Sequence, residues 1–434
     1  MKHKKLFISL TAVLTVFVFL GIFILIWFVG DSYKDFKKFN KEFAIEGLND
    51  GAIPQGITAY YANYSDYDDL DSNGKPKNKQ QQYFLVSAYM NDGSPSRIYV
   101  TGQVTGYIGF VTLKDQDGAH HYGHVGGIAT NGARVWIADG DSVAVARSSA
   151  EYGSENILRE IIDKAGKNKN REAGDEILSI QFTASFKANC NVAFLYYSDD
   201  SRYTGTTYDR LYVGEFYRKG NYETDKSHRL KTPTGYKNTA LMYEYNIDGS
   251  NSENPYGLTR LSDSNLTEEN KVPKIQKIYS LPEKIQGIAF SRRTGYSTND
   301  GMLVLSQSYG LSNSHLLCFD WAKVNELSNR AMYKQTTGYD FVYEGVYRTY
   351  GDNKIEYIDN SLYVYYVDKG NRDMLVNDYS VPSMSEGMCI VTPYGQNPEA
   401  IGRVYVLFES GSKKYNMFTR EKIKNVYSFI PHAK

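Results

Sequence analysis

The stretch "VGGIATNGARVWIADG", from Val125 to Gly140, contains the pattern that decides the fold of this chain. A glycine precedes a short apolar step, a turn of small and polar residues follows, and a second apolar run comes next. Short apolar runs bounded by Gly, Asn, Asp and Ser are typical of antiparallel strands joined by tight turns. One such unit cannot bury its own faces, so the fold depends on whether the pattern recurs.

The pattern recurs in four other places along the chain. It reads "PQGITAYY" from residue 54, "IQGIAF" from 285 and "SEGMCIV" from 385, with a weaker copy "NCNVAFL" from 189. The recurring positions are Gly56, Gly127, Asn191, Gly287 and Gly387, with gaps of 71, 64, 96 and 100 residues. Repeated units of several short strands predict an all-β fold, a β-propeller of five or six blades. The candidate for a sixth blade is "KIEYIDNSLYVYYVD" at 354–368.

One segment predicts a short helical insertion. Ser154 is the expected cap, the apolar positions 157, 158, 161 and 162 form one face, and the basic stretch after them reads as a loop. The three cysteines, Cys190, Cys318 and Cys389, lie far apart without a CxxC spacing, which predicts buried free thiols.

The N-terminal region predicts a membrane anchor. Residues 6–29 contain no charged side chain, and a helix of that length spans about 36 Å, enough to cross a bilayer. The run also exceeds the roughly 7–15 apolar residues of a cleaved signal peptide. We therefore expect a cytoplasmic tail at 1–5, a transmembrane signal-anchor at 6–29, a charged stalk at 30–50 and a propeller at 51–434. The short basic tail favours a single-pass protein of the cell membrane with its bulk outside the cytoplasm.

Several segments resemble a known group of proteins. The stretch "MSEGMCIVTPYGQNPEAIGRVYVLFESGSKKY" from residue 384, with "QGIAF" and "LVLSQSYG", resembles bacterial membrane-anchored or secreted propeller-like proteins. More distantly, the (Q/E)-G-(I/M) blade starts are similar to those of gluconolactonase, paraoxonase and calcium-activated nucleotidase propellers. In those families polar residues beside such glycines face a central funnel and bind a metal. The resemblance implies a funnel here, with Ca²⁺ as a cofactor to be tested.

Five polar residues are candidates for the funnel. Gln55, Gln286 and Glu386 share the position before the repeated glycine, Asn191 belongs to the weaker copy, and His124 lies three residues before Gly127. The innermost strands of a propeller line its central channel, so these side chains are expected to converge. Glu386 and carboxamide oxygens are ligands that suit Ca²⁺. Alternatively, these side chains satisfy the backbone of adjacent blades.

A second calcium motif lies in a polar insert. "DLDSNG" places Asp69, Asp71 and Asn73 at alternating positions before a glycine, as in the first half of an EF-hand loop. The twelfth position is Gln80 instead of the expected Glu. The insert is therefore either a calcium-stabilised surface loop or a solvated acidic segment.

The totals limit the function further. Lys plus Arg and Asp plus Glu both number 49, and zero net charge predicts no nucleic-acid partner. The sequence contains no GxSxG, P-loop, HExxH or GxGxxG motif. It favours a membrane-anchored binding module whose polar funnel takes an extracellular small molecule, glycan or protein. The alternative is a metal-dependent hydrolase of esters, lactones or phosphates with Ca²⁺ in the funnel, so enzymatic activity is left open.

Overall fold

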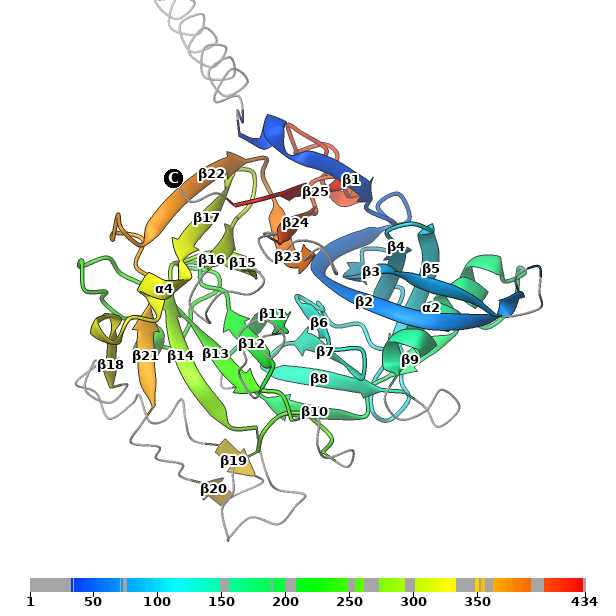
Figure 1. Ribbon diagram of the computed structural model, residues 1–434, viewed down its shortest axis with the longest axis horizontal. Helices are drawn as coiled ribbons and strands as arrows, with labels where there is room; N and C mark the ends of the chain where they lie inside the picture. The colour runs from blue at the N-terminus through cyan, green and yellow to red at the C-terminus, as the bar shows by residue number, and fades with distance from the viewer. Residues whose placement is uncertain are drawn as a thin grey trace, which may run out of the picture.

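The chain forms a ring of five sheets around one centre, seen down its short axis in Figure 1. The computed structural model describes residues 33, 35–70, 72, 76–148, 156–188, 190–199, 208–248, 254–260, 273–292, 301–332, 348–350, 353–355, 362–391 and 402–431. The described residues thus form an all-β, five-bladed propeller with few helices, as the repeat predicts.

Each blade is one mainly antiparallel sheet whose strands follow one another from the centre of the ring outward. Blade 1 contains β2 (Ala52–Leu70), β3 (Pro76–Met90), β4 (Arg97–Gly102), β5 (Gly106–Lys114) and β9 (Ser179–Gln181). Blade 2 contains β6 (Ile128–Thr130), β7 (Arg134–Asp139), β8 (Ser142–Arg147) and β10 (Ala184–Lys187). Blade 3 contains β11 (Val192–Ser198), β12 (Arg210–Glu215), β13 (Ala240–Asn246), β14 (Ile275–Leu281), β21 (Tyr363–Tyr366) and β18 (Arg330–Met332). Blade 4 contains β15 (Ile285–Arg292), β16 (Gly301–Gln307), β17 (Ser314–Asp320) and β22 (Leu375–Val381). Blade 5 contains β23 (Ser385–Val391), β24 (Arg403–Phe408), β25 (Asn425–Phe429) and β1 (Asn40–Ala44).

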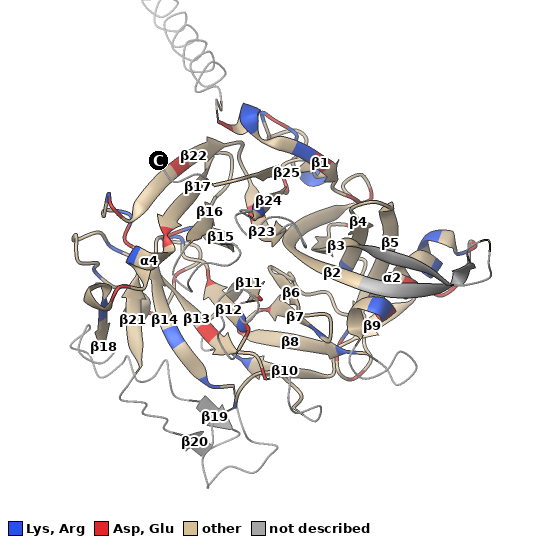
Figure 2. Cartoon of the chain, viewed as in Figure 1, with Lys and Arg blue, Asp and Glu red and all other residues tan. Residues whose placement is uncertain are grey.

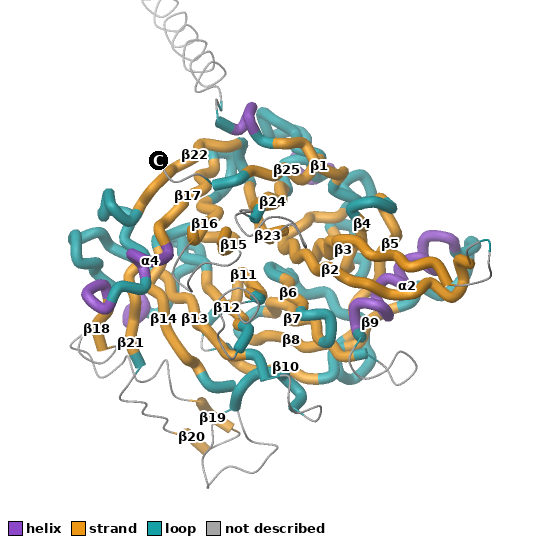
Figure 3. Tube along the Cα trace, in the orientation of Figure 1, coloured by secondary structure: helices purple, strands orange, loops and turns teal. Residues whose placement is uncertain are grey.

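The remaining elements are short or lie outside the blades. The helices are η1 (Phe36–Lys38), α2 (Ile157–Asn170), η3 (Lys226–His228), α4 (Trp321–Val324), η5 (Leu327–Asn329) and η7 (Lys413–Tyr415), and β19 (Arg348–Tyr350) pairs with β20 (Asn353–Ile355). Figure 3 shows α2 and α4 at the outer edge of the ring. Within the part of the chain described above, no helix combines the length and apolar character needed to cross a membrane. The predicted tail at 1–5 and anchor at 6–29 lie outside the described residues.

The repeated glycines allow the inner strands to approach one another. A Cβ on Gly56 would lie 2.7 Å from the backbone nitrogen of Ile128, and one on Gly387 would lie 2.9 Å from the Cα of Gly56. Real side chains do not tolerate backbone atoms at these distances, so the glycines let the blades close into a ring.

The weaker copy of the repeat has a different register from the one predicted. Val192 pairs with Glu215 and Phe194 with Gly214, so a bulge falls at Ala193. A Cβ on Gly127 would meet the Cα of Phe194 at 2.8 Å, which places Phe194, and not Asn191, at the glycine position. The Phe194 ring is accommodated because Gly214 on the next strand has no side chain to displace it.

Two expectations about the ends and the extra blade need correction. The stretch 354–368 is not a sixth blade, because β21 extends blade 3 alongside β14 and β20 belongs to a separate hairpin. The described part of the predicted stalk at 30–50 belongs to the propeller, because β1 pairs with β25 and completes blade 5. Phe36, Ile45 and Leu48 are accordingly buried in the core. The ring is therefore closed by pairing of its N-terminal strand with its C-terminal strand.

The helical insertion is longer than predicted. Helix α2 is capped by Asn156, whose side chain accepts a hydrogen bond from the Arg159 backbone nitrogen at 3.2 Å, while the expected cap Ser154 lies outside the described residues. The four predicted apolar positions are buried. The helix continues through the stretch predicted as a loop because Asn168 is buried and donates to the carbonyls of Phe110 and Leu178. All three cysteines are buried thiols, as predicted.

Candidate functional site

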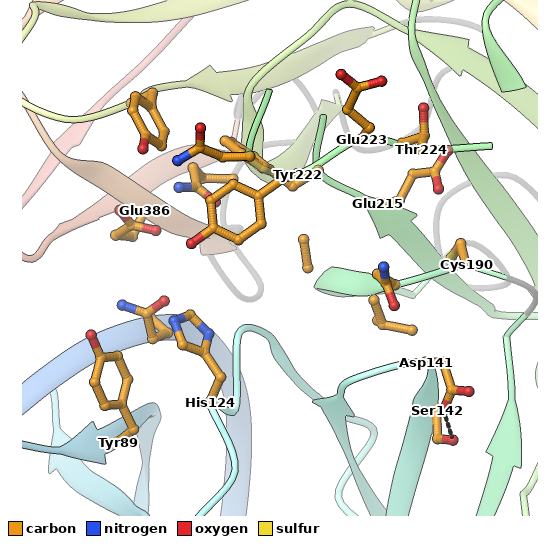
Figure 4. Close-up of a pocket in the computed structure, with 18 of the residues that line it drawn as sticks. Tyr89, His124, Asp141, Ser142, Cys190, Glu215, Tyr222, Glu223, Thr224 and Glu386 are labelled. Atoms are coloured by element: carbon orange, nitrogen blue, oxygen red, sulfur yellow. Dashed lines mark hydrogen bonds between the residues drawn. The ribbon is translucent and has the colours of Figure 1, made fainter. Parts of the chain in front are cut away.

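A large pocket lies where the five inner strands meet. Its volume is about 1300 Å³, and residues from all five blades line it. The structure brings together in its lining all five residues predicted from the repeat, namely Gln55, His124, Asn191, Gln286 and Glu386. In Figure 4 the side chains of Glu386 and His124 border the same open space, with the Tyr222 ring beside it. Their role in binding a ligand stays a prediction.

Three of these side chains reach the pocket through the same local irregularity. Gln55 is skipped in the pairing of β2 with β3, and Gln286 is skipped in the pairing of β15 with β16. A comparable break in β23 contains Glu386. A β-bulge redirects the side chain of the extra residue, and here it turns a polar group toward the centre.

The other two blades carry small residues at this position. They are Gly126 before β6 and Ala193 in β11. His124 and Asn191, which lie two residues earlier in each case, are exposed and line the pocket in these blades.

A pair of acids forms one wall of the pocket. Burial and the neighbouring Glu409 raise the pKa of Glu386 well above its usual range, so Glu386 keeps its proton and donates to Glu409. Burial also raises the pKa of Glu409 to about 7, although hydrogen bonds to its carboxylate act in the opposite direction. One of these comes from Gln55, whose Nε2 donates to Glu409 Oε2 at 3.1 Å across the seam between blades 1 and 5.

An aromatic group adjoins the acid pair. The rings of Tyr89 and His124 stack with centroids 4.7 Å apart, and Lys414 Nζ donates to the Tyr89 hydroxyl at 3.1 Å. Loss of water around the ring lowers the pKa of His124, and the positive charge of Lys414 lowers it further. The imidazole is therefore neutral near pH 7 and offers one donor and one acceptor to the pocket.

The opposite wall contains a buried ion pair and an exposed aromatic platform. Nδ1 of His228 lies 2.8 Å from Oε1 of Glu215, and both side chains are buried. Burial alone would lower the pKa of His228, but the Glu215 carboxylate outweighs burial and the pKa is raised. Tyr222 is 57% exposed and packs edge-on against Phe216 with centroids 5.6 Å apart. Phe216 in turn stacks on Tyr309.

Several pocket residues were not found from the sequence. Glu409 directly follows the apolar run of β24, so an acid at the end of a strand was the available signal. The loop at 216–228 carries Tyr222 and His228, and it has no counterpart in the repeat that would reveal it. Tyr89 reaches the pocket from the end of β3 and Lys414 from η7, where the repeat pattern is absent.

The three histidines at 120, 121 and 124 have different surroundings. His121 is buried, and its Nδ1 lies 2.8 Å from Asp115 Oδ1. His120 is exposed, whereas His124 stacks on Tyr89.

The calcium site predicted at Glu386 stays a prediction. The described part of the chain contains no group of three or more His, Cys, Asp or Glu side chains able to hold a metal. At the pocket wall Glu386 and Glu409 share a proton, and Gln55 donates its N–H group to Glu409. A Ca²⁺ ion at this wall would have to displace that proton, because Ca²⁺ takes unprotonated oxygen ligands.

The second calcium motif falls mostly outside the described part of the chain. Asp71 and Asn73 lie outside the described residues, and Asp69 is described only as backbone of β2. The calcium loop stays a prediction.

The fold and the pocket define the class, a five-bladed β-propeller with a central pocket. No protein-family model matches the chain, and no curated protein does. A solved structure described as "Structure of Dos1 propeller" is similar, with 8% identity and a TM-score of 0.27, over 91% of this chain and 76% of that chain. A likeness at this level says nothing about function.

Proposed function

We propose that this chain is a membrane-anchored, extracytoplasmic β-propeller that binds a glycan in its central pocket. The observation that carries the proposal is the composition of the pocket wall, which combines exposed aromatic faces with hydrogen-bonding groups whose charges are mostly compensated. Pockets for small molecules usually measure about 300–1000 Å³. A volume of about 1300 Å³ therefore leaves room for several sugar units.

Most charged groups of the wall have a partner of opposite charge or share a proton, which favours an uncharged ligand. His228 is paired with Glu215, and Lys187 is paired with Asp141. Glu386 and Glu409 share a proton. A charged ligand gains little from a wall most of whose charges already have partners, whereas hydroxyl groups can bond to both donors and acceptors.

The aromatic and amide groups suit a sugar ring. Tyr222 presents an exposed ring, which Phe216 supports from behind. Aromatic side chains offer an apolar face together with a polar tip, as a sugar with one apolar face and several hydroxyls requires. Asn191 and Gln286 supply amides that both donate and accept hydrogen bonds.

The anchor and the location rest on the sequence. Residues 6–29 carry no charge and precede the first described residue of the propeller, Tyr33, by only a few positions. Resistance of the full chain to alkaline carbonate extraction tests the anchor. Protease accessibility of the propeller on intact cells tests its location.

Calorimetry of the full chain in detergent, with a panel of cello-, chito-, manno- and galacto-oligosaccharides, tests the glycan. We expect one class to bind, and Tyr222→Ala to weaken its affinity about two- to tenfold, since an aromatic contact contributes roughly 0.5–1.5 kcal/mol. Tyr122→Ala is the matched control, because Tyr122 is 62% exposed but does not line the pocket. Binding to none of the panel, or equal affinity in the Tyr222 variant, would refute the proposal.

Metal analysis separates this function from the calcium-dependent hydrolase considered from the sequence. The binding module is expected to need no cation at Glu386. A stoichiometric cation that is removed by a chelator, and also lost in Glu386→Gln, would overturn the proposal in favour of the hydrolase.

A further inference from the structure

The loop after β24 exposes two adjacent large apolar side chains. Met417 is 91% exposed and Phe418 61%, and they lie within residues 413–424, which form the 413–424 loop. Each other exposed large apolar side chain of the described residues stands alone in the sequence. Single exposed apolar residues are normal on protein surfaces, whereas contiguous ones indicate an interaction site.

The turn that carries Met417 and Phe418, here called the tip, has a defined conformation. The backbone nitrogens of Phe418 and Thr419 both donate to the carbonyl of Tyr415, at 2.9 and 3.0 Å. Oγ1 of Thr419 donates to the carbonyl of Ser410 at 3.1 Å. These bonds hold the turn in place, so Met417 and Phe418 are presented outward without covering the core.

Basic side chains surround the tip. The 413–424 loop contains a single acidic residue, Glu421, and five basic residues: Lys413, Lys414, Arg420, Lys422 and Lys424. Its backbone is joined to the N-terminal segment, because Ile45 N donates to Lys424 O and Lys413 N donates to Leu48 O. Further Lys residues lie on η1 and β1, as Figure 2 shows. Apolar side chains within a basic surface suit the interface of an anionic bilayer.

The N-terminal sequence indicates why the partner is a membrane. The uncharged run ends at Val29, and the described chain begins at Tyr33, seven residues before β1, the outer strand of blade 5. Four residue steps span at most about 14 Å. An anchor at 6–29 therefore holds this edge close to the bilayer surface.

We infer that the 413–424 loop inserts Met417 and Phe418 into the headgroup region of an anionic membrane and so fixes the orientation of the propeller. The inference rests on the anchor in the proposed function. Because Lys414 and Tyr415 of the same loop also line the pocket, seating the loop holds that side of the pocket near lipid.

A fluorescent label tests the insertion. The full-length Met417→Cys variant, labelled with the environment-sensitive dye NBD, is reconstituted in vesicles of phosphatidylcholine with phosphatidylglycerol. The three native cysteines are buried, so the label goes to the introduced thiol. Leu327→Cys is the matched control, because Leu327 is 70% exposed and belongs to η5 between α4 and β18, across the ring from β1 (Figure 1).

We expect a blue-shifted emission at position 417 that nitroxide-labelled lipids quench, with neither effect at position 327. Lys422→Gln with Lys424→Gln should reduce the shift, and so should pure phosphatidylcholine. Equal emission at both positions in chains that resist carbonate extraction would refute the insertion while the anchor stands. If carbonate removes the chain, the anchor fails, and the emission recorded before extraction still decides whether the loop inserts.

Discussion

Replacing Glu409 with Gln removes the group whose pKa the pocket raises from 4.5 to about 7. A carboxyl with a higher pKa in the folded state binds more protons when folded than when unfolded. Its contribution to stability is therefore complete below about pH 4.5 and is lost as the pH rises through 7. The wild-type protein should lose more stability between pH 5 and pH 8 than the Glu409→Gln variant does.

The size of the effect follows from the two pKa values. The interval from 4.5 to about 7 corresponds to at most about 3.5 kcal/mol, at about 1.4 kcal/mol per pH unit. Glu409 retains some solvent contact, which reduces the expected difference to about 1–3 kcal/mol. For 434 residues the unfolding entropy is about 0.9 kcal/mol per degree, so Tm should differ by about 1–3 °C.

Thermal unfolding at pH 5 and pH 8 measures this difference. Glu172→Gln, at an exposed glutamate after α2, serves as the control and should follow the wild type. Joint replacement of Glu386 and Glu409 by Gln should reduce the pH dependence further, because Glu386 has a raised pKa as well. The reasoning is refuted if wild type and Glu409→Gln lose equal stability, or if the wild type gains stability as the pH rises.

Three other predictions concern the ring, the second ion pair and the insert. Gly127→Ala should destabilise the fold by about 3 kcal/mol, because its Cβ would meet the backbone of the next inner strand. Gly166→Ala in α2 should instead stabilise the fold by roughly 0.5–1 kcal/mol, because alanine is the better helix former. Denaturant unfolding measures the free-energy change for both variants. The raised pKa of His228 means that its pairing with Glu215 stabilises the fold at low pH and is lost as the pH rises through that pKa. The stability gap between wild type and Glu215→Gln should accordingly narrow from pH 6 to pH 9, and a constant gap would contradict it. If the insert binds Ca²⁺, adding it should raise Tm and Asp71→Ala should abolish the rise; no rise in the wild type would show a solvated segment.

The inner part of the ring could be predicted from the sequence because its constraint is local. Close approach of backbones demands glycine at Gly56, Gly287 and Gly387, and a bulge before each of them directs a polar side chain inward. The same logic failed at Asn191. In that blade Phe194 occupies the glycine position, and Gly214 on the next strand leaves space for its ring. The two residues lie far apart in sequence, so neither segment alone predicts the arrangement.

The rest of the site depends on contacts between segments far apart in sequence. Glu409 belongs to the pocket wall only because β24 lies beside β23, which buries it against Glu386. Tyr222 and His228 come from a loop outside the repeat, whose position depends on the folded ring. The pairing of β1 with β25 joins the two ends of the described propeller, so periodicity within either end could not predict it.

The pairing of β1 with β25 has a mechanical consequence. Strand β1 closes the ring and is also the first strand after the proposed membrane anchor. Any force between the membrane and a bound ligand is therefore applied to the pairing of β1 with β25. The ladder is antiparallel and interrupted between Lys41 and Ala44, which leaves few bonds to share the load. Under tension the propeller should open at blade 5 before any other blade yields.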